Sequence, residues 1–152
     1  MRAEREMSTP VGVITLCQKG GALCAIRFGG TGRRDETPLL LQAQRELEEY
    51  FAGRRTSFSV PLSIQGTEFQ QRVWRALQEI PYGQTLTYGE IARRIGRPKA
   101  GRAVGMANHC NPIPIIVPCH RVVGANGRLT GYAGGLAMKK MLLEIEGIHV
   151  EI

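Results

Sequence analysis

An apolar segment in the second half of the chain carries three polar side chains in a row. Residues 115–123 read IIVPCHRVV, so Cys119, His120 and Arg121 follow a run of aliphatic residues and a proline. A hydrophobic core needs none of these three groups. A cysteine reacts as the thiolate, and its ordinary pKa leaves little thiolate at neutral pH, so a base or a positive charge must assist it. The pattern therefore indicates a cysteine nucleophile, with His120 as its candidate base.

A histidine that acts as a base is usually oriented by a third group. In a regular strand, Cys119 and His120 would point to opposite faces. We therefore expect the chain to turn after Pro118 and a water molecule to connect the two side chains. The nearest acidic residues are Glu144 and Glu146, in or just after a helix expected over residues 136–146. The sequence does not choose between these two carboxylates.

Two other kinds of site use the same residue types. His109, Cys110, Cys119 and His120 could be metal ligands, but eight residues separate the two cysteines, and adjacent ligand pairs fit a tetrahedral zinc site poorly. We therefore predict no metal and no cofactor. A cysteine hydrolase would also use a Cys–His pair, but it would not explain the basic helix pair that precedes the cysteine.

The segments before the cysteine are expected to be mainly helical. Thr67 with Gln70 and Thr87 with Glu90 have the spacing of capping boxes, which predicts helices over about 67–80 and 89–95. Trp74 falls beside the apolar stripe of the first of these helices, so we expect it in the core.

A helix-turn-helix is expected over residues 89–107. Gly96-Arg97-Pro98-Lys99 joins two short helices with the spacing of that motif. Pro98 suits the first turn of the second helix. The expected apolar face of this helix comprises Ala100, Ala103, Val104 and Ala107. The residues 115–117 after it are expected to form a short buried strand.

Charge favours a nucleic acid partner. The net charge is +7 and the pI is near 9.7, which is common among proteins that bind polyanions. No acidic residue occurs between Glu90 and Glu144. That window holds nine basic residues: Arg93, Arg94, Arg97, Lys99, Arg102, Arg121, Arg128, Lys139 and Lys140. A stretch of one sign with helical patterning predicts a binding face.

The first half is expected to be a small α/β domain. Residues 11–17 and 23–28 predict a hairpin, 38–51 a helix, and 56–64 an edge strand or extended linker. We place the domain boundary between residues 64 and 65, giving domains 1–64 and 65–152 in an α+β fold. Cys17 and Cys24 lie in apolar strands and are expected to be buried hydrophobic residues.

The lack of long apolar runs in the sequence bears on the cellular compartment and on membrane insertion. The N-terminus MRAEREMSTP lacks the apolar core of a signal peptide, and no run is long enough to cross a membrane. We therefore expect a cytoplasmic protein with free thiols, associated with the nucleoid if the cell is prokaryotic.

The second half resembles the O6-alkylguanine-DNA alkyltransferase family. The resemblance rests on Pro118-Cys119-His120-Arg121, on Asn111-Pro112 before it and on Gly131-Tyr132 after it. It extends through 67–80, Thr87-Tyr88, Arg102-Ala103-Val104-Gly105 and Glu146-Gly147. The first half resembles the variable N-terminal, ribonuclease-H-like domain of the family more weakly, most clearly at Ser8-Thr9-Pro10-Val11-Gly12.

The resemblance implies a single-turnover DNA repair reaction. Cys119 would take the alkyl group from O6-alkylguanine irreversibly, and O4-alkylthymine would be a further substrate. His120 would act as a base through a water and Glu146 would orient it. Tyr88 would hydrogen-bond the guanine and protonate it as it leaves, and Asn111 would link the second helix to the segment of the cysteine.

The resemblance also implies how a double-stranded DNA partner would be bound by a monomer. The helix would enter the minor groove and Arg102 would fill the space of the flipped nucleotide. The other implied DNA contacts are Thr87, Tyr88, Arg97, Lys99, Ala103 and Gly105. The implied substrate pocket is formed by Asn108, Pro114, Val122, Tyr132, Ala133 and Gly134.

Departures from the family pattern refine the hypothesis. Asn108 stands where animal members pack an apolar side chain on the base. Pro114 and Gly134 stand where members with a roomy pocket have them, so we expect O6-benzylguanine to be accepted. The alternative function is a DNA-binding protein that recognises lesions without chemistry, since a non-reactive branch of the family lacks the cysteine. Cys119 argues against that branch.

Overall fold

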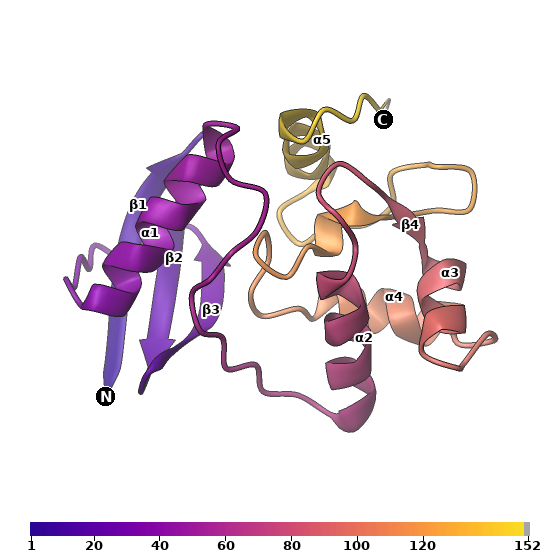
Figure 1. Ribbon diagram of the computed structural model, residues 1–152, viewed down its shortest axis with the longest axis horizontal. Coiled ribbons are helices and arrows are strands. Elements are labelled where there is room, and N and C mark those ends of the chain that lie inside the picture. Colours follow the sequence, from indigo (N-terminus) through magenta and orange to yellow (C-terminus); the bar gives the residue numbers. More distant parts are fainter. Residues whose placement is uncertain (151–152) are drawn as a thin grey trace. The chain divides into compact units, whose positions relative to one another are not determined.

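The computed structural model describes residues 1–150 (Figure 1). The chain divides into two compact units, Met1–Gln65 and Gly66–Ile152. The first contains a three-stranded sheet and one helix, and the second is mainly helical. The predicted α+β class is confirmed.

The N-terminal unit is an antiparallel sheet in the order β1-β2-β3 with helix α1. Its elements are β1 (Arg2–Thr9), β2 (Gly12–Lys19), β3 (Ala22–Phe28) and α1 (Pro38–Phe51). The predicted hairpin and helix are confirmed. Strand β1 was not predicted, because charged residues interrupt its apolar pattern. Of its residues, only Ala3 and Met7 are buried.

The segment after α1 is an extended linker. The Leu23 N–H donates to the Pro61 carbonyl and the Ser63 N–H donates to the Leu23 carbonyl, each at 2.9 Å. A single bridge joins Leu23 to Leu62. The buried carboxylate of Glu46 in α1 accepts a bond from the backbone N–H of Ser59 at 2.8 Å. These bonds hold the linker to its own unit, so it needs no strand partner along its length. Cys17 is buried as expected and Cys24 is half-buried.

Up to residue 150, the C-terminal unit is built from four α-helices and a two-stranded parallel sheet. The helices are α2 (Glu68–Gln78), α3 (Tyr88–Arg94), α4 (Gly101–His109) and α5 (Leu136–Ile145). Strand β4 (Leu86–Thr87) pairs with β5 (Val122–Val123), and a 3₁₀ turn, η1 (Cys119–Arg121), precedes β5. Helices α2, α3 and α4 pack on one another (Figure 1).

Both predicted capping boxes are present. The Thr67 side chain accepts from the Gln70 N–H at 3.1 Å, and the Thr87 side chain accepts from the Glu90 N–H at 3.1 Å. The reciprocal side-chain bonds also form. These local interactions fix the starts of α2 and α3 and explain why the sequence predicted them.

Two details predicted for α4 are wrong. The helix begins at Gly101, so Pro98 lies in the turn before it and not in its first turn. Ala103 is exposed, and the buried face is formed by Val104, Ala107 and Asn108. The buried stripe follows the i, i+3, i+4 spacing from Val104, so a polar side chain, Asn108, faces inward and Ala103 does not.

Trp74 ties α2 to α4. Its side chain is 2% exposed, and its indole Nε1–H donates to the carbonyl oxygen of Ala107 at 2.8 Å. The expectation that Trp74 belongs to the core is confirmed. Within residues 1–150, no helix is long and apolar enough to cross a membrane.

We predict that Trp74→Phe lowers the free energy of unfolding by about 1–3 kcal/mol, because it removes this hydrogen bond and leaves part of the indole volume empty. Urea unfolding of the full chain measures the change. Arg75→Gln, at the next and exposed position of α2, is the control and should change stability by less than about 0.5 kcal/mol. Equal stability of the two variants would contradict the role assigned to Trp74.

Candidate active site

Cys119 follows a buried turn and not a strand. Ile115 has a φ of 75°, a value that β-branched residues rarely adopt and that a strand does not contain. The predicted strand at 115–117 is therefore wrong, although Ile115, Ile116 and Val117 are all buried. The Val117 N–H donates to the Ile113 carbonyl at 3.0 Å, which closes the turn.

Asn111 holds this turn from the end of α4. Its Nδ2 donates to the Val117 carbonyl at 2.8 Å, and its Oδ1 accepts from the Ile113 N–H at 3.0 Å. Nearby, Asn108 Nδ2 donates to the carbonyl of Cys119 at 3.3 Å. Two amide side chains, one in the last turn of α4 and one two residues after its end, therefore fix the backbone that carries the cysteine.

The thiol of Cys119 is buried and protonated at neutral pH. Its residue is 5% exposed. Burial raises the pKa of Cys119 to about 11, against the opposing effects of a hydrogen bond from Asn111, the charge of Lys139 and the backbone N–H groups of Cys119 and His120. The thiol cannot react by spontaneous ionisation at neutral pH, so it needs a base.

His120, Arg121 and Glu146 form a buried cluster. His120 Nε2 lies 2.7 Å from Glu146 Oε2. Arg121 donates from Nε to Glu146 Oε1 at 2.8 Å, from Nη2 to Oε2 at 3.0 Å, and from Nη1 to the Ile80 carbonyl at 2.7 Å. Glu144 is exposed, so the structure selects Glu146 as the carboxylate that orients the histidine.

Burial of this cluster favours the neutral imidazole. Burial lowers the pKa of His120, against the opposing effect of the Glu146 carboxylate. When the neutral ring donates its Nε2–H to Glu146, its lone pair lies on Nδ1, which can accept a proton. The arrangement can therefore serve as a general base.

Tyr88 stands where three elements meet. It is the first residue of α3, its hydroxyl accepts from the Thr130 hydroxyl at 2.9 Å, and Gly105 of α4 lies against its ring. The Thr87 hydroxyl is engaged as the cap of α3. Tyr88 is half-buried, so its phenol can meet both solvent and the loop at residues 124–135.

The predicted pocket residues fall into two environments. Pro114, Val122 and Tyr132 are buried, whereas Ala133 is exposed. A side chain at Gly134 would collide with Met138 and come within 3.2 Å of the Tyr132 ring. The Met138 contact involves the flexible end of that side chain, so a larger residue at Gly134 would displace Met138 and press on the Tyr132 ring.

The predicted DNA-binding residues are on the surface. Arg97, Lys99, Arg102 and Ala103 are exposed, in the turn between α3 and α4 and on α4 itself. The sequence analysis missed Met106, which is 65% exposed on the same helix. Its position four residues after Arg102, on the same face of α4, is the signal that could have indicated an apolar side chain there.

Lys139 is the second residue that was missed. The basic window assigned it to a binding face, but its side chain is fully buried, as is that of Arg121 apart from a small fraction. Lys139, Leu142, Leu143 and Glu146 are spaced as one face of α5 and are all buried. That stripe was the available signal that Lys139 points inward.

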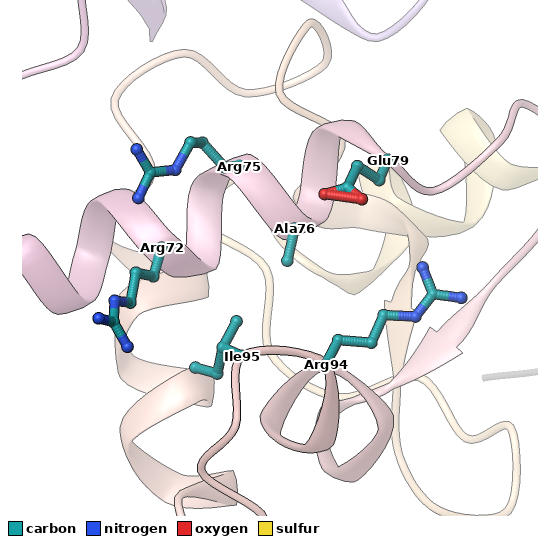
Figure 2. A pocket seen from close by; sticks show the side chains of 6 residues that line it. All are labelled: Arg72, Arg75, Ala76, Glu79, Arg94 and Ile95. Carbon is teal, nitrogen blue, oxygen red and sulfur yellow. The ribbon is translucent and has the colours of Figure 1, made fainter.

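A basic hollow lies elsewhere in the C-terminal unit, between α2 and α3 (Figure 2). It measures about 560 Å³ and is lined by Arg72, Arg75, Ala76, Glu79, Arg94 and Ile95. It holds no nucleophile and no predicted site residue. Within residues 1–150, no three His, Cys, Asp or Glu side chains are grouped to hold a metal ion.

Known protein families match both units. Residues 4–64 match the ribonuclease-like domain, and residues 68–148 the DNA-binding domain, of 6-O-methylguanine DNA methyltransferase. A methylated-DNA–protein-cysteine methyltransferase of Methanosarcina acetivorans is 54% identical over 147 residues, covering 91% of this chain and 94% of that protein.

Solved structures agree with these matches. The Mycobacterium tuberculosis OGT in complex with DNA has a TM-score of 0.88 and 50% identity, covering 95% of this chain and 92% of that chain. Atl1 of S. pombe, in complex with damaged DNA containing O6-carboxymethylguanine, has a TM-score of 0.51 and 40% identity, covering 57% of this chain and 82% of that chain.

We predict that iodoacetamide labels Cys110 well before Cys119 in the free protein at pH 8, because Cys110 is exposed whereas burial raises the pKa of Cys119 from 9.0 to about 11. The ionised fraction of Cys119 should be about a hundredfold below that of an ordinary thiol and rise tenfold per pH unit. Peptide mapping after timed labelling measures both rates. Equal rates at the two cysteines would show that the thiol of Cys119 is not suppressed.

Proposed function

This chain belongs to the 6-O-methylguanine DNA methyltransferase family, and on that premise we propose that it repairs double-stranded DNA by moving the alkyl group of O6-alkylguanine to Cys119. The observation that carries the proposal is the buried cysteine beside the His120–Glu146–Arg121 cluster. The class of activity, methyl transfer from DNA to a protein cysteine, is that of the family. We assign DNA binding and transfer to residues 65–152.

The proposed reaction is a displacement at the alkyl carbon. Glu146 holds the Nε2 proton of His120, and neutral His120 takes the proton of Cys119 through a water. The thiolate attacks the alkyl carbon, so that an S–C bond forms as the C–O6 bond breaks. The electron pair leaves with the guanine, which Tyr88 protonates. Asn111 holds the turn that carries the thiolate.

The product is a thioether, and no group of this site is suited to cleave it. Each molecule therefore reacts once. No metal or cofactor has a part in the displacement as proposed. O4-alkylthymine presents the same kind of O–alkyl bond and is proposed as a further substrate.

The reacting atom lies inside the duplex, so the nucleotide must be flipped out. We propose that α4 enters the minor groove, with Arg102 in the space that the nucleotide leaves and Ala103 close to the backbone of the DNA. The exposure of both residues supports this placement. Gly105 lies against the Tyr88 ring, where an added Cβ would make ordinary van der Waals contact at 3.8 Å.

Contacts to phosphate and base complete the proposal. Arg97, Lys99 and Thr87 would bind phosphates, which makes affinity depend on salt. The flipped base would be enclosed by Asn108, Pro114, Val122, Tyr132, Ala133 and Gly134. We propose that the protein acts as a monomer and, in a prokaryotic cell, stays with the nucleoid through its affinity for DNA.

We predict that mixing the protein with duplex DNA containing O6-methylguanine adds the mass of one methylene group to the Cys119 peptide. Intact mass and peptide mapping measure this change. Cys119→Ala should abolish it, because the acceptor sulfur is lost, whereas Cys110→Ala should retain it. Lesion binding without a mass change would instead favour a sensor that recognises damage without chemistry.

Mass analysis of the same peptide tests whether O6-benzylguanine and O4-alkylthymine are also substrates. Free O6-benzylguanine should add a benzyl group to Cys119, and a duplex with O4-methylthymine should add a methyl group. An unlabelled Cys119 peptide with either compound, under conditions where O6-methylguanine DNA labels it, would remove that substrate from the proposal.

We predict that Arg102→Ala slows transfer from methylated duplex by about tenfold to a hundredfold, because flipping costs a few kcal/mol that an inserted side chain partly offsets. Single-turnover kinetics on duplex DNA measure the change. Arg54→Ala, which removes an exposed arginine of the N-terminal unit, is the control and should leave the rate unchanged. An Arg102→Ala rate equal to that of the control would contradict the intercalating role.

A further inference from the structure

The basic hollow between α2 and α3 is lined by arginines that have no part in the active site. Arg72 and Arg75 come from α2, and Arg94 is the last residue of α3. Figure 2 shows Ala76 and Ile95 between Arg72 and Arg94. The hollow therefore presents guanidinium groups at both ends and two apolar side chains between them.

The positive charge of this hollow is poorly neutralised by the chain itself. In the described part of the chain, no carboxylate lies within ion-pairing distance of Arg75 or Arg94, and both are exposed. Arg72 pairs with Glu68 at 3.4 Å, but the Glu68 side chain is 84% exposed. Such an exposed ion pair contributes little, so Arg72 can exchange its partner for another anion. Glu79 is the one acidic residue of the lining.

Two further hollows continue the first one toward the turn between α3 and α4. The second has a volume of about 230 Å³, is lined by Glu68, Phe69, Arg72 and Arg97, and shares Arg72 with the first. The third has a volume of about 420 Å³, is lined by residues 96–100, and shares Arg97 with the second. Because each hollow shares an arginine with the next, we call the three together the basic groove. Its basic side chains are Arg72, Arg75, Arg94, Arg97 and Lys99.

The length of the basic groove fits a polymer better than a small anion. Arg72 and Glu79 are seven residues apart on α2, which is about 10 Å of helix axis. One strand of a DNA duplex rises about 3.4 Å per nucleotide, so this length matches about three nucleotides. A guanidinium group binds a phosphate through two parallel N–H donors, and a phosphodiester backbone presents such phosphates in a row.

We propose that the basic groove binds the phosphate backbone of DNA and extends the DNA-binding surface from the α3–α4 turn along α2. This inference rests on the proposed function, in which Arg97 and Lys99 bind phosphates. The groove continues from these two residues, so a strand held there would meet Arg72 first and then Arg75 and Arg94. Contacts to phosphates carry no sequence information, so the groove would hold damaged and undamaged DNA alike.

The test compares two double variants that remove the same charge. Arg75→Gln/Arg94→Gln is the groove variant, and Arg45→Gln/Arg54→Gln, at exposed positions of the N-terminal unit, is the control variant. Fluorescence anisotropy measures the affinity of the full chain for undamaged duplex between about 50 and 200 mM salt. Urea unfolding verifies that both variants are folded.

We predict that the groove variant binds a duplex of about 20 base pairs about tenfold more weakly than the wild type at low salt, because phosphate contacts are lost. The slope of log affinity against log salt concentration should become shallower by about 1–2, since each lost contact removes about 0.9. The control variant should match the wild type in both quantities. On a duplex of about 10 base pairs the groove variant should come close to the wild type, because the shorter backbone does not reach along the groove.

The acidic residue of the groove gives a prediction of opposite sign. Glu79→Gln removes the negative charge from the lining, so it should tighten binding of the longer duplex by about twofold to threefold. Glu48→Gln removes the same charge from an exposed position of α1 and should match the wild type. Tighter binding by both variants would show an effect of net charge and not of the groove.

Two results would overturn the proposal: a groove variant equal to the control variant in affinity and salt dependence, or an equal loss of affinity on both lengths of duplex. Single-turnover transfer from methylated duplex gives a second readout. The groove variant should reach the wild-type rate at saturating duplex but need about tenfold more DNA to do so, because the groove contains no group of the active site. If the wild type transferred no methyl group, the proposed function would fail, while the binding of undamaged duplex would still decide whether the groove holds DNA.

Discussion

The buried carboxylate of Glu146 is the group on which the rest of the active site depends. It binds His120 and Arg121, and it also accepts from the backbone N–H of Gly83, 63 residues earlier in the chain, at 3.1 Å. Taking a carboxylate out of water costs several kcal/mol unless polar and charged partners replace the water. Three partners replace it here, so the end of α5, the turn η1 and the segment before β4 are fixed to one point. The imidazole acquires its orientation from the same contacts.

A site held together in this way excludes water. This desolvation shifts the pKa values of His120 and Cys119 in opposite directions. Burial keeps His120 neutral and able to accept a proton, but it also raises the pKa of the Cys119 thiol. The base and the hydrogen bonds to sulfur must therefore work against the desolvation that the packing imposes. The same packing leaves little room for an added alkyl group, and overfilling a well-packed site is destabilising. Chemistry and stability are thus linked at Cys119.

Helix α4 connects the surface to this interior. Arg102, Ala103 and Met106 lie on its outer face, whereas Val104 and Asn108 are buried. Asn108 in its last turn binds the cysteine carbonyl, and Asn111, just after its end, holds the turn before the cysteine. In the proposed function, a duplex bound to the outer face would therefore be connected to Cys119 through one short helix. The basic residues between Glu90 and Glu144 are also divided between surface and interior. Most of them are exposed, whereas Arg121 and Lys139 are buried.

The sequence alone determined the features that depend on neighbouring residues. The capping boxes at Thr67 and Thr87, the hairpin of β2 and β3 and the Cys–His pair are local patterns, and local physics decides them. Strand β1 and the turn at 115–117 were missed or misassigned, because pairing with β2 and the bonds from Asn111 override the local pattern. The burial of Lys139 likewise came only from the tertiary structure. Glu146, which neighbouring residues did not separate from Glu144, was chosen by the family resemblance, and it is the carboxylate that lies against His120. Burial is set by packing between segments that lie far apart in the chain. A lysine in a basic stretch is therefore predicted to be exposed, and only the packing of its helix shows that this face points into the core.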